Sequence, residues 1–159
     1  MVVSMRDFTC RIVVPAIIAA VALSAGASWS ELGDAVDLGK YQWENRLLLV
    51  FAPTGAEPLY QALHESLVER GAEIEDRDLV VFEVFESGPS TEDGESIDPA
   101  TARLLRQRFR VPSGAFSVIL VGKDGGVKLA RQDQTSIDEI FALIDSMPMR
   151  RQEMLRERP

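Results

Sequence analysis

Residues 45–60 read N-R-L-L-L-V-F-A-P-T-G-A-E-P-L-Y, an apolar run followed by a turn and the start of a helical pattern. Their apolar run, 47–52, is short and continuous, which is typical of a strand buried on both faces. Pro58 suits the first position of a helix, because the N–H that proline lacks would have no acceptor there. Glu57 precedes the proline and is disfavoured from helical dihedral angles. The stretch therefore predicts a buried strand, a short turn and a helix that begins at Pro58 and ends at Gly71.

Two further apolar runs continue the alternation of strands and helices. Residues 79–86 and 116–121 predict buried strands. Asp98 and Pro99, an N-cap and a first-position proline, open a helix between them. The polar segment 87–98, rich in glycine, proline and acidic residues, predicts a mobile loop.

The C-terminal part predicts a hairpin and a closing helix. The sequence K-D-G-G at 123–126 contains the Asp-Gly pair favoured in tight hairpin turns, and 127–130 returns as the paired strand. Ser136 and Glu139 form a capping box for a helix that Pro148 ends. The element order is β-α-β-α-β-β-α. Strands joined by helices run parallel and hairpin strands run antiparallel, so we expect an α/β sandwich with a small mixed sheet and helices on both faces.

The N-terminus has the layout of a secretory signal peptide. Residues 1–27 combine a positively charged start, an apolar stretch and a small-residue site, A-G-A, that ends at Ala27. The apolar stretch is shorter than the roughly 20 residues of a membrane span. We expect cleavage after Ala27, with 28–148 as the folded domain and 149–159 as a charged tail. An uncleaved N-terminal anchor is the alternative.

Charge and cysteine content exclude several classes of protein. The chain carries a formal net charge of −8, and Cys10 is its single cysteine. Cleavage would remove Cys10 and leave the exported domain without a thiol. An acidic protein gains no counterion-release attraction to nucleic acid, which excludes nucleic-acid binding, and binding to an anionic membrane surface is disfavoured for the same reason. We expect an exported protein, periplasmic or secreted, with no stable membrane span after cleavage.

Four segments carry a resemblance to a known family: N-R-L-L-L-V-F-A-P (45–53), R-D-L-V-V (77–81), V-I-L-V-G-K-D-G-G-V-K (118–128) and I-D-S-M-P-M-R-R-Q-E-M (144–154). Through them the chain is similar to domain of unknown function family 4174 over residues 40–155. The resemblance implies a thioredoxin- or peroxiredoxin-like fold without an established activity. It also implies likeness to exported bacterial single domains and to domains of animal matrix-associated proteins, including coiled-coil domain-containing protein 80 and sushi-repeat proteins.

The resemblance suggests a redox role by analogy, but the composition excludes thiol chemistry. Thioredoxin chemistry needs a low-pKa cysteine at the turn after the first strand, backed by a resolving cysteine. Residues 53–58 contain neither, and the peroxidatic cysteine that peroxiredoxins need near this turn is absent too. Pro112 lies several residues too early to match the cis-proline that thioredoxin-like sites place before the third strand.

The turn after the first strand is one candidate ligand site. A helix start presents backbone N–H groups and the positive end of the helix dipole, which suit a small anion or a carboxylate. Thr54 and Gly55 lie at this start, and Arg46 and Lys123 are expected near the ends of the sheet. An ordinary capped helix is the alternative.

A basic stripe is the second candidate. Arg103, Arg106 and Arg110 fall within about 60° of one another at 100° per helical residue. Such a stripe could contact an anion or an acidic partner. A solvated face that pairs with the acidic segment 87–98 is the alternative.

No cofactor, metal or catalytic group is expected. His64 is the single histidine, so the sequence does not support a zinc site. Residues 92–98 do not fit the spacing of an EF-hand. A solvated loop is the preferred interpretation of this segment, and calcium binding is the alternative. His64 falls in the middle of a predicted helix and is interpreted as a structural residue, with a general-base role as the alternative.

These patterns favour an exported, non-catalytic module that binds an unidentified protein or envelope component, because the predicted fold is complete while the thiols are missing. The alternative is a non-thiol enzyme or antioxidant factor that uses Arg46, His64 or the turn at 53–58.

Overall fold

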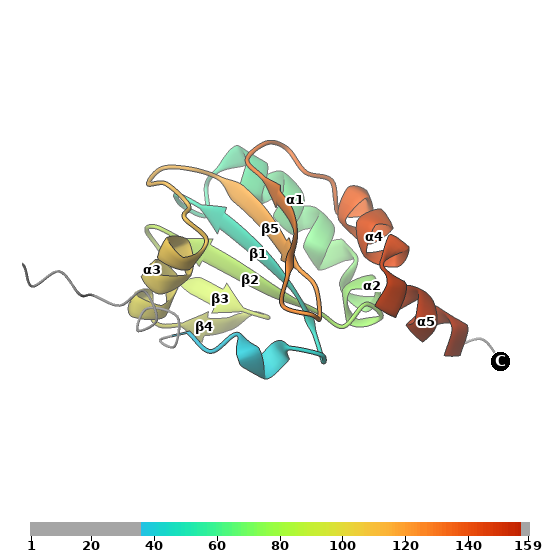
Figure 1. Ribbon diagram of the computed structural model, residues 1–159. Coiled ribbons are helices and arrows are strands. Elements are labelled where there is room, and N and C mark those ends of the chain that lie inside the picture. Colours follow the sequence, from blue (N-terminus) through green and yellow to red (C-terminus); the bar gives the residue numbers. More distant parts are fainter. Residues whose placement is uncertain (1–35, 157–159) are drawn as a thin grey trace, which may run out of the picture.

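The computed structural model describes residues 36–156, and Figure 1 shows a central sheet with helices on both of its faces. The predicted signal peptide and its cleavage site lie outside the described residues. No helix in residues 36–156 has the length and apolar character needed to cross a membrane. The elements, in chain order, are η1 (Gly39–Tyr41), β1 (Arg46–Ala52), α1 (Pro58–Glu69), α2 (Gly71–Glu75), β2 (Leu79–Phe85), β3 (Ser90–Glu92), β4 (Glu95–Ile97), α3 (Pro99–Arg108), β5 (Ser117–Val121), β6 (Val127–Arg131), α4 (Ile137–Ser146) and α5 (Pro148–Arg156).

The six strands form one mixed sheet in the order β4-β3-β2-β1-β5-β6. β1 pairs in parallel with β2 and antiparallel with β5, and β5 forms the antiparallel hairpin with β6. All seven residues of β1 are buried. The predicted parallel pair of β1 and β2, the hairpin and the α/β class are therefore confirmed. The expectation that β5, which follows helix α3, also runs parallel is wrong, because β5 pairs antiparallel with β1.

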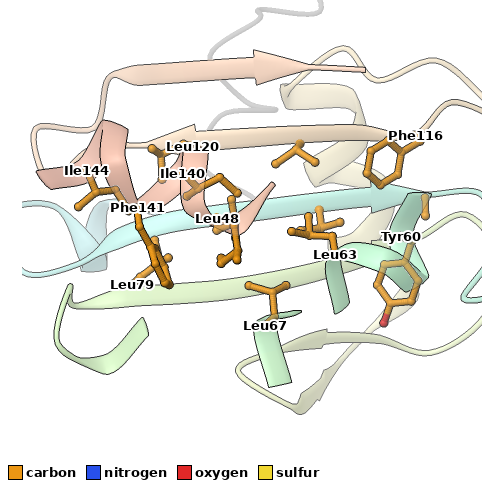
Figure 2. Packing of buried hydrophobic residues seen from close by; sticks show 14 residues of the cluster. Leu48, Tyr60, Leu63, Leu67, Leu79, Phe116, Leu120, Ile140, Phe141 and Ile144 are labelled. Atoms are coloured by element: carbon orange, nitrogen blue, oxygen red, sulfur yellow. The ribbon is translucent and has the colours of Figure 1, made fainter. Parts of the chain in front are cut away.

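The core has two halves because successive residues of β1 point to opposite faces of the sheet. On one face Leu48 belongs to a cluster with Leu63 of α1 and Ile140 of α4, shown in Figure 2. On the other face Phe51 belongs to a cluster with Leu105 of α3. β1 is thus the element around which both layers of helices pack.

The prediction of a mobile loop over residues 87–98 is wrong. β3 and β4 form a hairpin whose turn residues, Asp93 and Gly94, have φ angles of 47° and 81°, as in the tight turns that join two strands. Asp93 N donates to Val81 O at 2.8 Å, and its carboxylate accepts from Val81 N at 2.7 Å. The turn is therefore fixed to β2. The sequence did not predict these two strands, because polar strands of three residues show no alternation of hydrophobic and polar side chains.

The helix starts follow the sequence more closely than the helix ends. The Asp98 carboxylate accepts from Ala100 N at 2.9 Å, and the Ser136 hydroxyl accepts from Asp138 N at 3.1 Å, so the caps at Asp98 and Ser136 are confirmed. The return bond from Glu139 that a capping box requires is not formed within the described residues. Gly71 begins α2 instead of ending α1. Likewise α4 has already ended when the chain reaches Pro148, the first residue of α5.

Candidate functional site

The turn after β1 is a self-contained helix start. The Thr54 hydroxyl accepts from Ala56 N at 3.3 Å, and Thr54 O accepts from Glu57 N at 3.2 Å. The Gln61 side chain donates to Gly55 O. No cysteine lies anywhere in residues 36–156. The predicted candidates Thr54 and Gly55 therefore lie in a turn whose hydrogen bonds are largely internal.

Arg106 lies at the same end of the sheet but is not a surface residue. It is 8% exposed, and it donates to Ala52 O at 3.3 Å and to Pro112 O at 2.7 Å. These bonds tie the end of β1 to the loop before β5. Arg103 and Arg110 are exposed. The expectation of one solvated basic stripe is therefore wrong, because its central member is a buried structural cation.

Glu86 completes this end of the sheet. Its carboxylate accepts from Gly114 N at 2.7 Å and from the Ser113 hydroxyl, and it lies 3.6 Å from the Arg106 guanidinium. The bond from the Gly114 amide and then that from Ser113 lower the pKa of Glu86. Arg103 and Glu86 both line a cavity of about 370 Å³. The carboxylate thus holds the loop before β5 against β2.

Arg46 and Lys123 lie at the opposite end of β1. Arg46 is the first residue of this seven-residue strand, which places it about 20 Å from the turn with Thr54 and Gly55 at the usual rise per residue. The structure therefore separates Arg46 and Lys123 from the predicted helix-start site and brings them to each other instead.

The carboxylate of Glu153, on α5, joins these two cations. Glu153 Oε2 lies 2.9 Å from Arg46 Nη2, and Glu153 Oε1 lies 2.8 Å from Lys123 Nζ. Lys123 also pairs with Asp78 at 2.7 Å. Burial would raise the pKa of Glu153, but the hydrogen bonds from Lys123 and Arg46 outweigh it, and the pKa lies below its usual value. A charged Glu153 therefore fastens the last helix to the central strand.

A larger group of alternating charges surrounds this pair, and we call it the charge cluster. Arg150 is 3% exposed and donates to Asp76 O at 2.8 Å, which fixes α5 to the segment before β2. The part of the predicted tail that the structure describes is thus packed against the domain. The charge cluster has four cations and four carboxylates: Arg46, Arg77, Lys123, Arg150, Asp76, Asp78, Asp145 and Glu153.

A cavity of about 170 Å³ opens beside the charge cluster, and we call it the cationic cavity. Its wall contains Arg46, Lys123 and Lys128 together with residues 147–149. Three of the four segments that carry the family resemblance, 45–53, 118–128 and 144–154, meet at this wall. Residues far apart in the sequence that resemble a family and gather at one cavity mark it as the candidate functional site.

Trp43 lies close to this site on the surface. Its side chain is 63% exposed, and its φ angle is 73°. Trp43 N donates to Lys123 O at 2.7 Å, which fixes this conformation against the β5–β6 turn. A bulky residue at positive φ is a backbone outlier. The fold therefore tolerates strain at a position where it also exposes a large aromatic ring.

A second polar group surrounds Glu83 on β2. Glu83 Oε1 lies 2.6 Å from His64 Nδ1 and accepts from the Tyr60 hydroxyl at 2.9 Å, while Oε2 accepts from Thr91 at 3.1 Å. Burial, and then the bond to Glu83, raises the pKa of Tyr60. The side chain of His64 is 41% exposed. The predicted structural histidine is thus an oriented one, with its ring fixed by a carboxylate.

Sequence reasoning missed the carboxylates that complete both groups, Glu153 and Glu83. One available signal was the spacing of Arg150 and Glu153, which places them on one face of a helix within the segment 144–154. For Glu83 no local signal exists. Within residues 36–156, no three side chains of the metal-ligating types lie together as a metal site would require.

The fold and the thiol-free turn define the class of the protein, a thioredoxin-like α/β domain. The reduced 2-Cys peroxiredoxin of Plasmodium vivax superposes with a TM-score of 0.53 at 14% identity, covering 74% of this chain and 85% of that one. Thioredoxin peroxidase I of Plasmodium yoelii also superposes with a TM-score of 0.53, at 16% identity over 72% of this chain and 79% of that one. At these identities the likeness establishes the fold alone.

The family follows from the sequence. The model of the family described as "Domain of unknown function (DUF4174)" matches residues 37–153, and the chain belongs to that family. It is 31% identical over 133 residues to coiled-coil domain-containing protein 80 of Danio rerio, covering 74% of this chain and 15% of that protein. It is also 31% identical over 121 residues to the sushi repeat-containing protein SRPX of Rattus norvegicus, covering 74% and 26%. The chain thus spans about a quarter or less of the length of these relatives.

Proposed function

We propose that this chain is an exported, non-catalytic module that binds a protein or envelope component. The observation that carries the proposal is Trp43, an exposed aromatic residue held at positive φ. Tryptophan is among the residues most enriched at binding hot spots. Backbone strain of about 1–3 kcal/mol persists where the surroundings fix it, and it often accompanies function.

The surface around Trp43 supports this proposal. Five large hydrophobic side chains are exposed in residues 36–156, and three of them, Trp43, Val127 and Met149, flank the β5–β6 turn. Val127 directly follows the turn and lines a cavity of about 420 Å³ on one side of it, whereas Met149 lines the cationic cavity with Lys123 on the other side. Interfaces combine such apolar and aromatic contacts with a polar rim. We call Trp43, Val127 and Met149 the contact surface.

The opposite end of the sheet supports the non-catalytic part of the proposal. Where a thioredoxin-like chain needs a reactive thiol, this chain has Thr54, Gly55 and the internal hydrogen bonds of their turn. Arg106 and Glu86 at this end are engaged with main-chain groups. We therefore assign binding to the contact surface and architecture to the end of the sheet with the turn.

In-cell crosslinking followed by mass spectrometry of the exported fraction tests the proposal. We expect a specific partner with the unaltered chain and its loss with Trp43→Gly, because glycine accepts the positive φ while removing the ring. Val68→Ala removes another exposed apolar side chain, on α1, and serves as the matched control. Finding no partner, or equal capture by Trp43→Gly, would count against the proposal.

A second candidate function, a non-thiol enzyme, is favoured by the oriented His64. A histidine held by a carboxylate through Nδ1 is suited to proton transfer at Nε2. The purified protein would be screened against ester, phosphoester and peroxide substrates. Turnover that His64→Gln abolishes and Glu65→Gln preserves would support this candidate, and absence of turnover would exclude these reactions. Peroxide also oxidises methionine, so its consumption by Met147, Met149 and Met154 must be measured separately from catalytic turnover.

A further inference from the structure

We infer that the cationic cavity binds a carboxylate group carried by the partner. The inference deepens the proposed function, because it names the chemistry that the contact surface recognises beside Trp43. It starts from the side chains of the wall, three cations (Arg46, Lys123 and Lys128) and one carboxylate (Asp124).

Arg46, in the cavity wall, carries a hydrogen-bond donor that has no acceptor among residues 36–156. It is 1% exposed, and within the described part of the chain its Nε has no hydrogen-bond acceptor, although Nη1 and Nη2 are engaged. A buried donor without an acceptor costs about 1–3 kcal/mol. Nε itself is buried behind the wall, so Arg46 offers the cavity its charge, and a ligand carboxylate reaches this donor when the side chain shifts toward it.

The start of helix α5 lies at the cavity wall. Pro148 is the first residue of this nine-residue helix, and it lines the cavity together with Met149. The first turn of a helix leaves N–H groups without intrahelical acceptors, and here Met149 carries one of them. The positive end of the helix dipole adds to the preference for an anion.

Lys128 supplies a cation that can turn toward a ligand. Its side chain is 34% exposed and pairs with Asp124 at 2.6 Å, four positions away. An exposed ion pair of this kind contributes about 0.5 kcal/mol. A ligand carboxylate that takes charge-assisted hydrogen bonds from several donors is therefore able to compete with Asp124 for Lys128.

The size of the cavity restricts the ligand. At about 170 Å³ it is smaller than the roughly 300–1,000 Å³ of sites for drug-sized molecules. It fits a group of the size of one amino-acid residue, with its apolar part against the adaptable side chains of Met147 and Met149. Two sources offer this chemistry, the C-terminal residue of a polypeptide and an acidic side chain within one.

Methyl NMR on the protein purified from cells that express the full chain, with 13C-labelled methionine methyl groups, tests the inference. Three acetylated tripeptides are titrated: Ala-Ala-Leu with a free carboxylate, the same peptide amidated, and amidated Ala-Glu-Ala. We expect the methyl signals of Met147 and Met149 to shift with a carboxylate peptide and not with amidated Ala-Ala-Leu. A response to the first peptide assigns a chain terminus, and a response to the third assigns an acidic side chain.

Two variants locate the binding. Lys128→Gln should weaken carboxylate binding roughly tenfold, as expected for the loss of one charge-assisted hydrogen bond. Arg131→Gln removes a charge from the same strand outside the cavity wall and should have little effect. No shift with any carboxylate peptide, an equal shift with amidated Ala-Ala-Leu, or equal weakening by Arg131→Gln would overturn the inference. The crosslinking experiment with Trp43→Gly tests the proposed function and does not depend on the peptide titrations. The proposed function and the inference can therefore fail separately.

Discussion

Arg46 and Glu153 lie 107 positions apart in the sequence and form an ion pair of 2.9 Å that joins the first residue of the central strand to the last helix. Arg46 is 1% exposed, whereas the side chain of Glu153 is 19% exposed. Arg46 also lines the cationic cavity. Loss of the pair would therefore both loosen α5 and affect a residue of the cavity wall.

Glu153→Gln is expected to lower the free energy of unfolding by about 3 kcal/mol, because it leaves Arg46 as a buried charge without its partner. Urea unfolding measures the effect. Glu65→Gln, an exposed carboxylate on α1, is the matched control and should change stability by less than about 0.5 kcal/mol. Equal effects of the two substitutions would show that the ion pair contributes nothing.

The same pair makes stability depend on acid pH. The pKa of Glu153 in the folded chain lies below its usual value of 4.5. The unfolded chain therefore takes up this proton first, so the contribution of Glu153 is present above that value and is lost as pH falls through the lower, folded pKa. The difference in urea midpoint between the unaltered chain and Glu153→Gln should be full at pH 7 and narrow steadily below about pH 4.5. A difference that stays constant down to pH 3 would contradict the assigned charge.

Replacement of Trp43 separates strain from contact. Trp43→Gly should leave the free energy of unfolding unchanged or raise it by about 1 kcal/mol, because glycine adopts positive φ without a Cβ clash. Trp43→Ala keeps the strain and should be less stable than Trp43→Gly. Urea unfolding measures the free energy of unfolding of both variants. A marked loss of stability in Trp43→Gly would show that the Trp43 ring packs as part of the core.

Arg106 should tolerate substitution far less than its neighbour on α3. Arg106→Lys loses the planar donor pair that reaches Ala52 O and Pro112 O, and we expect a cost of about 1.5–3 kcal/mol. Arg103→Lys, in the same helix and exposed, should cost less than about 0.5 kcal/mol. Thermal unfolding compares the Tm of the two variants. Equal decreases in Tm would support the earlier interpretation of Arg106 as a surface residue.

Local sequence signals were sufficient for most of the fold. The apolar run of β1, the first-position prolines Pro58 and Pro99, and the cap at Asp98 each act within a few residues, so they could be recognised without the structure. The hairpin of β3 and β4 could not, because its polar strands of three residues take their stability from pairing with β2 and from the bonds between Asp93 and Val81.

Only part of the candidate site could be predicted from the sequence. Arg46 and Lys123 were named from the sequence, but their shared carboxylate lies on α5, and an ion pair between distant elements leaves no local pattern. The burial of Arg106 likewise leaves no local pattern in the sequence. Helical spacing places it beside Arg103 and Arg110, yet packing against the end of β1 decides that it is buried.

Site-specific photo-crosslinking compares the two ends of the sheet in one experiment and so shows which of them binds a partner. Benzoylphenylalanine is placed at position 43, in the contact surface, or at position 56, in the exposed turn after β1, and the exported fraction is irradiated. We expect a discrete covalent adduct with a partner from position 43 and none from position 56. An adduct from position 56 and none from position 43 would contradict it.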